Sequence, residues 1–268
     1  MTPNRTRVFA VLAREALSDA LRRRLVLAVA VASLLSLQLV DSCTSCGSAT
    51  LVRDGQTVTL PEVAGFGALA VMVACALWTL LLAGFLASDH LAEPLQDGSA
   101  SLLLARPVGR GHFALARLAG ALAIALASGA LLLFATGALL HARQGLPWWP
   151  VLPAFAACAA GASTVGALAM LASLYLPRVA TVLLVMMGVT GVAAVNLAGL
   201  FGAELGGLAA AIERFGPPLV SSVALALREW IAPTAVPGDP QLLALRQIAW
   251  MLASAALLVH GFRRVELE

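Results

Sequence analysis

The chain has 268 residues, of which 60% are hydrophobic and only 12% are charged, and its formal net charge is +3. Because a soluble domain carries roughly 25% charged residues, this composition excludes an ordinary soluble globular protein and predicts several membrane spans. All 17 basic residues are arginines. A P-loop needs a lysine for the nucleotide phosphates, so we expect no ATP site and no enzymatic activity in this chain. Any ATP hydrolysis that drives it must come from another subunit.

Residues 7–24 predict an amphipathic helix that lies on the membrane surface. Apolar residues recur along one face at helical spacing, while the charged residues lie elsewhere around the helix. The alternative is a plain cytoplasmic extension of the first span, which we place at residues 25–40. A cleaved signal peptide fits less well, because Asp41 falls within any candidate cleavage site.

Five further apolar stretches predict membrane spans. They cover residues 63–87, 113–140, 151–176, 179–201 and 242–262. With the first span they give an all-α membrane protein with six transmembrane helices in a single domain, residues 1–268. The loop 41–62 predicts a small β-hairpin, because Asp54-Gly55 separates two short β-prone runs.

Residues 202–240 are less apolar and predict two short helices. We place them at 202–215 and 219–231, with Gly216-Pro217-Pro218 as the break between them. We interpret them as a short outer helical hairpin, periplasmic or re-entrant, before the last span. The alternative is that one of the two helices crosses the membrane.

The distribution of arginines predicts the orientation of the chain. With six spans and both termini inside, twelve arginines lie on inner segments and five on outer segments. Positively charged loops remain cytoplasmic, so both termini and the segment 88–112 are expected on that side. The inner set is Arg5, Arg7, Arg14, Arg22, Arg23, Arg24, Arg106, Arg110, Arg117, Arg178, Arg263 and Arg264; the outer set is Arg53, Arg143, Arg214, Arg228 and Arg246.

The centres of the second to fifth spans contain no Asp, Glu, Arg or His. Intramembrane ionisable residues mark proton relays and ion paths, so their absence argues against an ion channel and an ion-coupled transporter. We expect Asn196 and the hydroxyl residues of the spans to form packing hydrogen bonds. Cys75 and Cys158 are expected to act as small apolar residues.

Cys43 and Cys46 form a CxxC motif just outside the first span. The motif fits a structural disulfide in an oxidising compartment, a pair of metal or sulfur ligands, or free thiols. We take the disulfide as the working interpretation. The 4 histidines are scattered along the chain, so the sequence supports no zinc site.

The polar segment 88–112 carries the strongest functional signal. It is acidic at first, turns at Asp97-Gly98, and then runs through Leu102-Leu103-Leu104 into Arg106-Pro107-Val108-Gly109-Arg110. A plain loop between two spans needs neither a leucine triplet nor a rigid basic turn. The combination predicts a short helix on the inner face of the membrane that is offered to a cytoplasmic partner.

The six-span pattern, the leading amphipathic helix and this segment together resemble the permease subunits of ABC-2-type transporters. The matching residues are Gly98-Ser99, Leu102-Leu103-Leu104 and the turn from Pro107 to Arg110. Residues 13–19 and Arg22–Arg24 fit the opening segment of that family. Together these details are similar to the branch that contains the permease of the nitrous-oxide-reductase maturation transporter.

The resemblance implies a homodimer, or a heterodimer with a similar permease, in the bacterial inner membrane. Two cytoplasmic ABC ATPase subunits would bind the ATP and Mg, and this chain would hold no cofactor, metal or nucleic acid. It would export a substrate or transmit force to a periplasmic partner. The implied ATPase-coupling residues, none of them catalytic, are Asp89, Glu93, Asp97, Gly98, Arg106, Pro107 and Arg110.

Two other functions remain open at this stage. The first is a non-transporting membrane scaffold or assembly factor that never meets an ATPase. The second is an intramembrane enzyme, which the lack of suitable polar groups in the spans disfavours. Arg106 and Arg110 also suit the phosphates of membrane lipids, as any basic turn at a membrane surface does.

Overall fold

The computed structural model describes residues 60–96, 110–230 and 239–264, together with two short strands and four single helical positions nearer the N-terminus. The predicted interfacial helix, the first span and the segment 97–109 otherwise lie outside the described residues. The strands, β1 (Val52–Arg53) and β2 (Gln56–Thr57), pair antiparallel with Arg53 opposite Gln56. This pairing leaves Asp54 and Gly55 between the strands, which confirms the predicted hairpin.

Five helices in the described part of the chain are long and apolar enough to cross a membrane. They are α3 (Leu60–Gln96), α5 (Arg110–Gln144), α6 (Val151–Ala172), α7 (Arg178–Leu200) and α10 (Pro240–Arg264). Even α6, the shortest, spans about 33 Å at 1.5 Å per residue, which exceeds the roughly 30 Å hydrocarbon core. The chain is therefore a mostly helical, multi-pass membrane protein.

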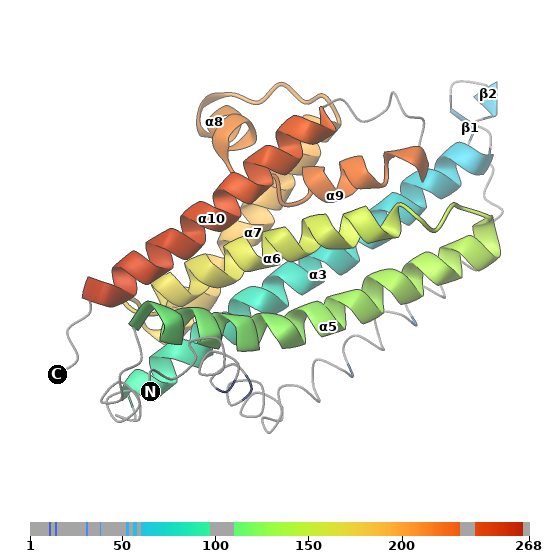
Figure 1. Cartoon of the computed structure of the whole chain (residues 1–268). Coiled ribbons are helices and arrows are strands. Elements are labelled where there is room, and N and C mark those ends of the chain that lie inside the picture. The colour runs from blue at the N-terminus through green and yellow to red at the C-terminus, as the bar shows by residue number, and fades with distance from the viewer. Residues whose placement is uncertain are drawn as a thin grey trace.

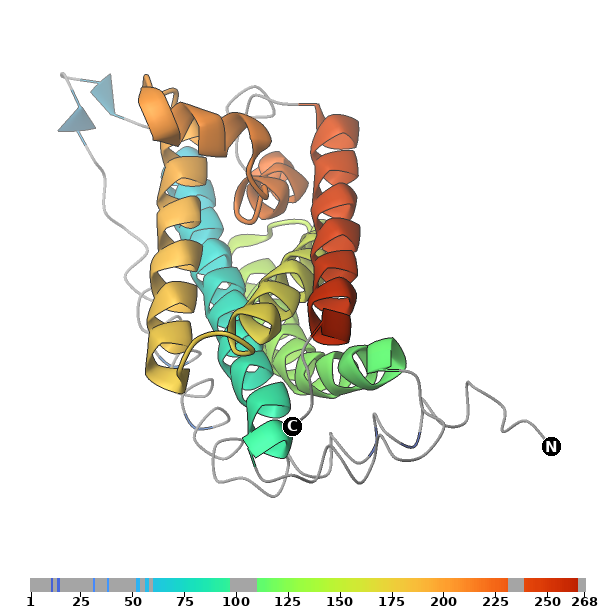
Figure 2. The ribbon, with the colours of Figure 1, turned by 90° about the vertical axis from the view of Figure 1, so that its left-hand side faces the viewer.

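The five helices alternate in direction, so the bundle has two ends that we name from Figure 2. At the lower end α3, α6 and α10 finish, and α5 and α7 begin. At the upper end α5 and α7 finish, and the strands and two further short helices lie there (Figures 1 and 2). The segment 97–109 connects two helices at the lower end.

One boundary differs from the sequence prediction in a way that matters for function. Residues 88–96, which include the acidic Asp89 and Glu93, are not part of a separate polar element, because α3 continues through them to Gln96. Extending an existing helix adds a hydrogen bond for each residue without a new nucleation step, which favours continuation over a break at the membrane surface. Pro94 has no N–H to donate to the carbonyl four residues earlier, and the helix ends two residues after it, at Gln96.

Helix α6 lies at the centre of the bundle and packs against α3, α5, α7 and α10 (Figure 1). Small buried residues line its contact with α3, among them Ala76 and Ala83 of α3 and Ala154 and Ala162 of α6. Small side chains let helix backbones approach closely, which is how helices associate in lipid. The buried Cys75 and Cys158 are free thiols within this packing, as expected of small apolar residues.

Helices α7 and α10 lie at the periphery. Only 28% of the apolar window of α7 and 17% of that of α10 are buried, against 61% for α3. Their exposed residues are large and apolar, for example Met187 and Leu252. In a membrane protein such faces contact lipid or another membrane helix.

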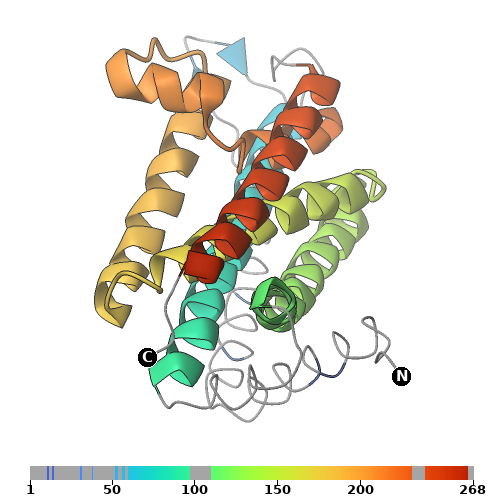
Figure 3. The same ribbon diagram turned by 60° about the vertical axis from the view of Figure 1, so that its left-hand side comes forward.

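The region 202–240 carries two short helices, α8 (Gly207–Phe215) and α9 (Ser221–Ala226), and a 3₁₀ turn at Arg228–Trp230. Figure 3 shows α8 across the upper end of α7, where none of its residues is buried. By contrast, α9 packs against α6 and α10 with Val223 and Ala224 fully buried. Their lengths of about 14 and 9 Å rule out the alternative that one of them crosses the membrane.

The close contact between α3 and α5 provides a test of this packing. A Cβ atom at Gly129 would lie 2.5 Å from Thr79 Cγ2, whereas a Cβ atom at Gly191 would meet nothing within 4 Å. We expect Gly129→Leu to destabilise the bundle by about 1–3 kcal/mol through overpacking, and Gly191→Leu to leave it nearly unchanged. Thermal unfolding of both variants in detergent measures the difference; equal midpoints would contradict this packing.

Candidate functional site

An ion pair at the lower end joins α3 to α7. Arg178 Nη2 donates to Asp89 Oδ2 over 2.7 Å, with the arginine side chain 69% exposed and the aspartate 16% exposed. Because an exposed pair of this kind is worth only about 0–1 kcal/mol, it contributes little to folding. Its effect is to fix the first residue of α7 against α3 at the depth where α3 leaves the membrane.

The turn between α6 and α7 places Arg178 for this contact. Helix α6 ends at Ala172, earlier than the predicted end at Leu176, and residues 173–176 form a turn before Pro177. Leu176 directly precedes the proline, a position where the helical conformation is disfavoured. The backbone N–H groups of Tyr175 and Leu176 both donate to the carbonyl of Ala172, which tightens the turn. Pro177 then precedes the first residue of α7, a position that suits proline because its missing N–H has no role there.

A second contact at the lower end joins α5 to α10. The buried rings of Phe113 and Phe262 stack with their centroids 6.1 Å apart, and the Arg117 guanidinium carbon lies 5.5 Å from the centroid of the Phe113 ring. Close by, a Cβ atom at Gly111 would lie 2.9 Å from Val259 Cγ1, so the glycine permits a tight approach. Aromatic stacking and burial make this contact much stronger than an exposed ion pair.

The two helices that bracket the segment 97–109 are therefore tied to different partners, α3 to α7 and α5 to α10. Of the residues that we predict to couple to an ATPase, Asp89 lies in the ion pair, Glu93 lies in the end of α3, and Arg110 is the exposed first residue of α5. The other predicted coupling residues fall outside the described residues; they are Asp97, Gly98, Arg106 and Pro107. The two cysteines of the CxxC motif, Cys43 and Cys46, also fall outside them. Their roles stay predictions.

At the upper end, α10 holds α8 by capping its C-terminus. Arg246 Nη1 donates to the carbonyls of Glu213 and Arg214 over 2.9 and 3.0 Å, and Trp250 Nε1 donates to the carbonyl of Phe215 over 2.9 Å. The last carbonyls of a helix have no partner within the helix, so these donors satisfy groups that otherwise lack one. Since α8 also packs on α7, it bridges α7 and α10.

Asn196 fixes the start of α9 to α7. Its Oδ1 accepts hydrogen bonds from the Val220 backbone N–H over 3.2 Å and from Ser221 Oγ over 3.3 Å. Trp230, just after α9, donates from Nε1 to the carbonyl of Pro147 over 2.8 Å. The prediction that Asn196 is a packing residue is confirmed, and these bonds complete the closure of the upper end.

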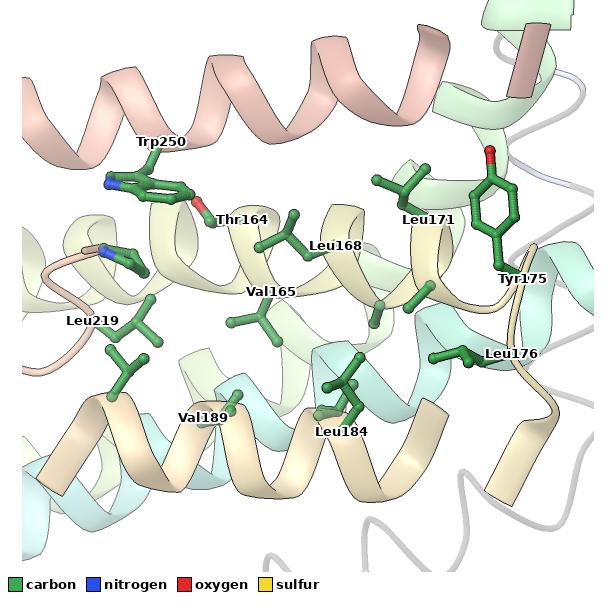
Figure 4. Close-up of a pocket in the computed structure, with 16 residues that line it drawn as sticks. Thr164, Val165, Leu168, Leu171, Tyr175, Leu176, Leu184, Val189, Leu219 and Trp250 are labelled. Carbon is green, nitrogen blue, oxygen red and sulfur yellow. The ribbon is translucent and has the colours of Figure 1, made fainter. Parts of the chain in front are cut away.

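Between the two peripheral helices lies an apolar groove with a volume of about 590 Å³. Figure 4 shows its walls, with α10 on one side, α7 on the other and α6 as the floor. Pro217, Leu219 and Trp250 line its upper part, and Tyr175 and Leu176 line its lower part. The bridge through α8 closes the top, whereas at the lower end α7 contacts α3 and α10 contacts α5, and both also pack on α6.

Among the described residues, no three His, Cys, Asp or Glu side chains form a group that could hold a metal ion. The main features of this part of the molecule are the two helix contacts at the lower end and the apolar groove.

Three features were not predicted from the sequence: the partner of Asp89, the capping donors Arg246 and Trp250, and the groove. The first had a usable signal, because Asp89 and Arg178 both lie at the predicted inner boundary of a span and carry opposite charges. The capping donors had a weaker one, since an arginine and a tryptophan four residues apart on one helix share a face. The groove had no signal in the sequence, because its position depends on which helices do not pack against each other.

The capping of α8 can be tested by proteolysis. In the double variant Arg246→Met, Trp250→Phe, the end of α8 loses its donors, and trypsin should cleave after Arg214 about tenfold faster or more. Hydrogen bonds from a charged donor are worth about 1.5–3 kcal/mol, and cleavage follows the population of the opened form. The matched control is Leu245→Ala, on the exposed side of α10 next to Arg246. A cleavage rate that stays at the control level in the double variant would rule out the capping role.

Comparison with known proteins adds no family assignment to this geometry. No protein-family model matches the chain, and no curated protein matches it.

Proposed function

We propose that this chain is the transmembrane permease subunit of an ATP-driven ABC-2-type transporter. The observation that carries the proposal is the pair of ties at the lower end, Asp89 with Arg178 and Phe113 with Phe262. They connect the two helices that leave the membrane around segment 97–109 to the two helices that flank the groove. A force applied to that segment would therefore reach the groove.

The orientation that this function needs follows from the arginine distribution. In a six-span topology, twelve arginines lie on the side of the lower end and five on the other side. Positively charged segments remain in the cytoplasm, so the lower end would face the cytoplasm and both termini would lie there. The segment 97–109 would then be accessible to a soluble ATPase.

Helix α3 is suited to act as a lever. It continues as a helix for seven residues past Asp89, or about 10 Å beyond the ion pair. Packed helices move as rigid bodies, so displacement of Gln96 would tilt the whole helix. Through Asp89 and Arg178 the tilt would reach α7, and a corresponding tilt of α5 would reach α10 through Phe113 and Phe262.

The upper end determines what this tilt does. Because α8 bridges α7 and α10 there, the two helices would pivot about their upper ends and change their spacing at the lower end. ATP binding by two cytoplasmic ATPase subunits, with Mg bound there as well, would supply the work. The groove would then widen and narrow in step with the ATPase cycle.

The remaining coupling residues act at the contact with the ATPase. Arg106 and Arg110 are suited to an acidic groove on that partner, because arginine pairs with carboxylates in a defined geometry. Glu93, Asp97, Gly98 and Pro107 would shape the surface between them. A second copy of the chain would complete the transporter, which either exports a hydrophobic substrate or transmits force to a periplasmic partner.

Charge reversal tests the contact with the ATPase. The double variant Arg106→Glu, Arg110→Glu should reduce co-purification of the ATPase in mild detergent by tenfold or more, because close charge pairs at interfaces contribute about 1.5–7 kcal/mol. Affinity purification with ATP hydrolysis as the second readout measures the loss. The matched control is Arg143→Glu, an arginine on the outer side in the proposed topology.

Reversing two inner arginines also acts on topology, so insertion must be checked in the same variants. A cysteine introduced by Ser99→Cys should react with an impermeant reagent only after the inner face is opened, with and without the reversal. Protein that inserts correctly and retains its ATPase would remove the coupling role of the two arginines. Protein that never co-purifies with an ATPase would point to the scaffold function instead.

The ion pair between Asp89 and Arg178 provides a test of force transmission. Asp89→Arg and Arg178→Asp should each lower the stimulation of ATP hydrolysis by substrate severalfold, yet change thermal stability by no more than about 1 kcal/mol, as for other exposed ion pairs. The doubly exchanged variant should recover part of the stimulation, because the pair forms again with its charges reversed. The measurement is a double-mutant cycle on stimulated ATPase activity. Additive losses without recovery would show that the pair transmits no force.

A further inference from the structure

We propose that the groove between α6, α7 and α10 binds one acyl chain of an anionic phospholipid, whose phosphate lies at the lower end between Tyr175 and Arg264. The proposal requires that the bundle spans a membrane and is independent of any ATPase. Its basis is an amphiphilic site: apolar walls closed at one end, with polar and cationic groups only at the other.

The walls of the groove leave no polar group unsatisfied except at its lower mouth. Thr164 donates its hydroxyl to the carbonyl of Ala160 over 3.1 Å, and Trp250 donates its indole N–H to Phe215 over 2.9 Å. The remaining lining of the shaft is aliphatic, as at Leu184 and Val189. A polar substrate would lose its hydrogen bonds to water there and gain none, whereas a hydrocarbon chain would lose nothing.

The groove has the dimensions of an acyl chain in a single leaflet. Trp250 lies at its upper part, and Tyr175 Oη would be 3.6 Å from a Cβ atom at Gly261 near the lower end of α10. The eleven residues from 250 to 261 rise about 16 Å, which is close to half of the roughly 30 Å hydrocarbon core. The volume of about 590 Å³ falls within the range of roughly 300–1,000 Å³ for small-molecule sites.

Tyr175 provides a hydrogen-bond donor at the mouth. Figure 4 shows its ring at the lower end of the groove with the hydroxyl directed toward α10. The residue is 65% exposed, and within the described residues its hydroxyl makes no hydrogen bond. Tyrosine is favoured at the boundary of a bilayer, where its ring contacts the chains and its hydroxyl contacts the headgroups.

Arg264 provides the positive charge. It follows Trp250 and Leu257 at intervals of seven residues, so the three lie along one stripe of α10. Trp250 lines the groove at the upper end of this stripe, and Arg264 comes one turn after Gly261, the position that faces Tyr175. Arg264 is exposed and forms no hydrogen bond or ion pair with the part of the chain that the structure describes. Arg178 stands on the opposite side of the mouth, already paired with Asp89. Among the described residues, the mouth therefore has an excess of positive charge, which selects a negatively charged headgroup over a zwitterionic one.

The test uses the full chain in vesicles and the fluorescence of Trp250. The probes are phosphatidylglycerol and phosphatidylcholine, each brominated at mid-chain so that it quenches a nearby tryptophan, titrated into unlabelled phosphatidylcholine vesicles. We expect the anionic probe to quench at about fivefold lower mole fraction, which corresponds to the roughly 1 kcal/mol of one arginine at an anionic surface. Trp250→Phe should abolish this headgroup-dependent quenching, which assigns the signal to the groove.

Matched variants separate binding of the acyl chain in the groove from recognition of the headgroup at its mouth. Gly188 lines the groove and a Cβ atom there would meet nothing within 4 Å, so Gly188→Leu should fill the groove without disturbing the fold and abolish the quenching. Its control is Gly191→Leu, equally open but not part of the lining. Arg264→Glu should remove the fivefold preference and retain chain binding, whereas Arg263→Glu, with the same change in charge on the other side of α10, should retain the preference.

Three outcomes would overturn the proposal. Equal quenching by both headgroups would exclude the anionic site, and quenching that survives Gly188→Leu would place the lipid elsewhere. Cross-linking of a cysteine at Gly188 to residues 25–40 of the same chain, or to a second copy, would show that protein and not lipid fills the groove. If Gly188→Leu fails to fold, the comparison of Arg264→Glu with Arg263→Glu still decides the headgroup preference.

Discussion

The close approach of α6 to its neighbours through small side chains is the constraint on which the rest of this structure depends. In lipid, apolar side chains gain little by meeting one another, so helices must associate through tight packing and hydrogen bonds. Ala154 and Ala162 of α6 and Ala83 of α3 provide that packing without a polar cost. Helix α6 packs on α3, α5, α7 and α10, and Figure 2 shows α7 and α10 on either side of it. The groove is the consequence of this arrangement.

The two ends of the groove differ in the interactions that hold them. At the upper end, Arg246, Trp250 and Asn196 satisfy backbone groups of α8 and α9 that have no other partner. Breaking such bonds away from water carries the full cost of an unsatisfied polar group, so this end resists opening. At the lower end, Asp89 and Arg178 meet in partly exposed surroundings where water replaces a lost contact at little cost. In the proposed function, the lower end is therefore the end that would move, while the upper end would stay closed.

Much of the helical architecture could be predicted from the local sequence, and the predictions that were wrong have identifiable physical causes. Five of the six predicted spans correspond to long helices, because twenty or so apolar residues have few alternatives to a helix in a membrane. The Asp54-Gly55 hairpin was predictable for a similar local reason. The extension of α3 to Gln96 was missed because polarity was taken to end the helix, although polarity ends only the membrane contact. The site was less predictable, since the tie between Asp89 and Arg178 joins residues 89 positions apart and depends on which helices are neighbours.

The unequal strength of the two lower ties has a consequence for motion. The rings of Phe113 and Phe262 are buried against each other, and this burial favours continued contact between α10 and α5. Asp89 and Arg178 contribute at most about 1 kcal/mol, an amount that a change at the end of α3 can readily overcome. Helices α5 and α10 should then stay together, while the contact of Arg178 with Asp89 can open and close where α7 begins. Farther up, α7 remains packed on α3, where Val185 lies against Gly84. A contact that breaks easily has two accessible states of similar free energy, and a partner that binds one of them better needs only modest binding energy to shift the population. Under the proposed function, the weaker tie is for that reason the better place for control by a partner.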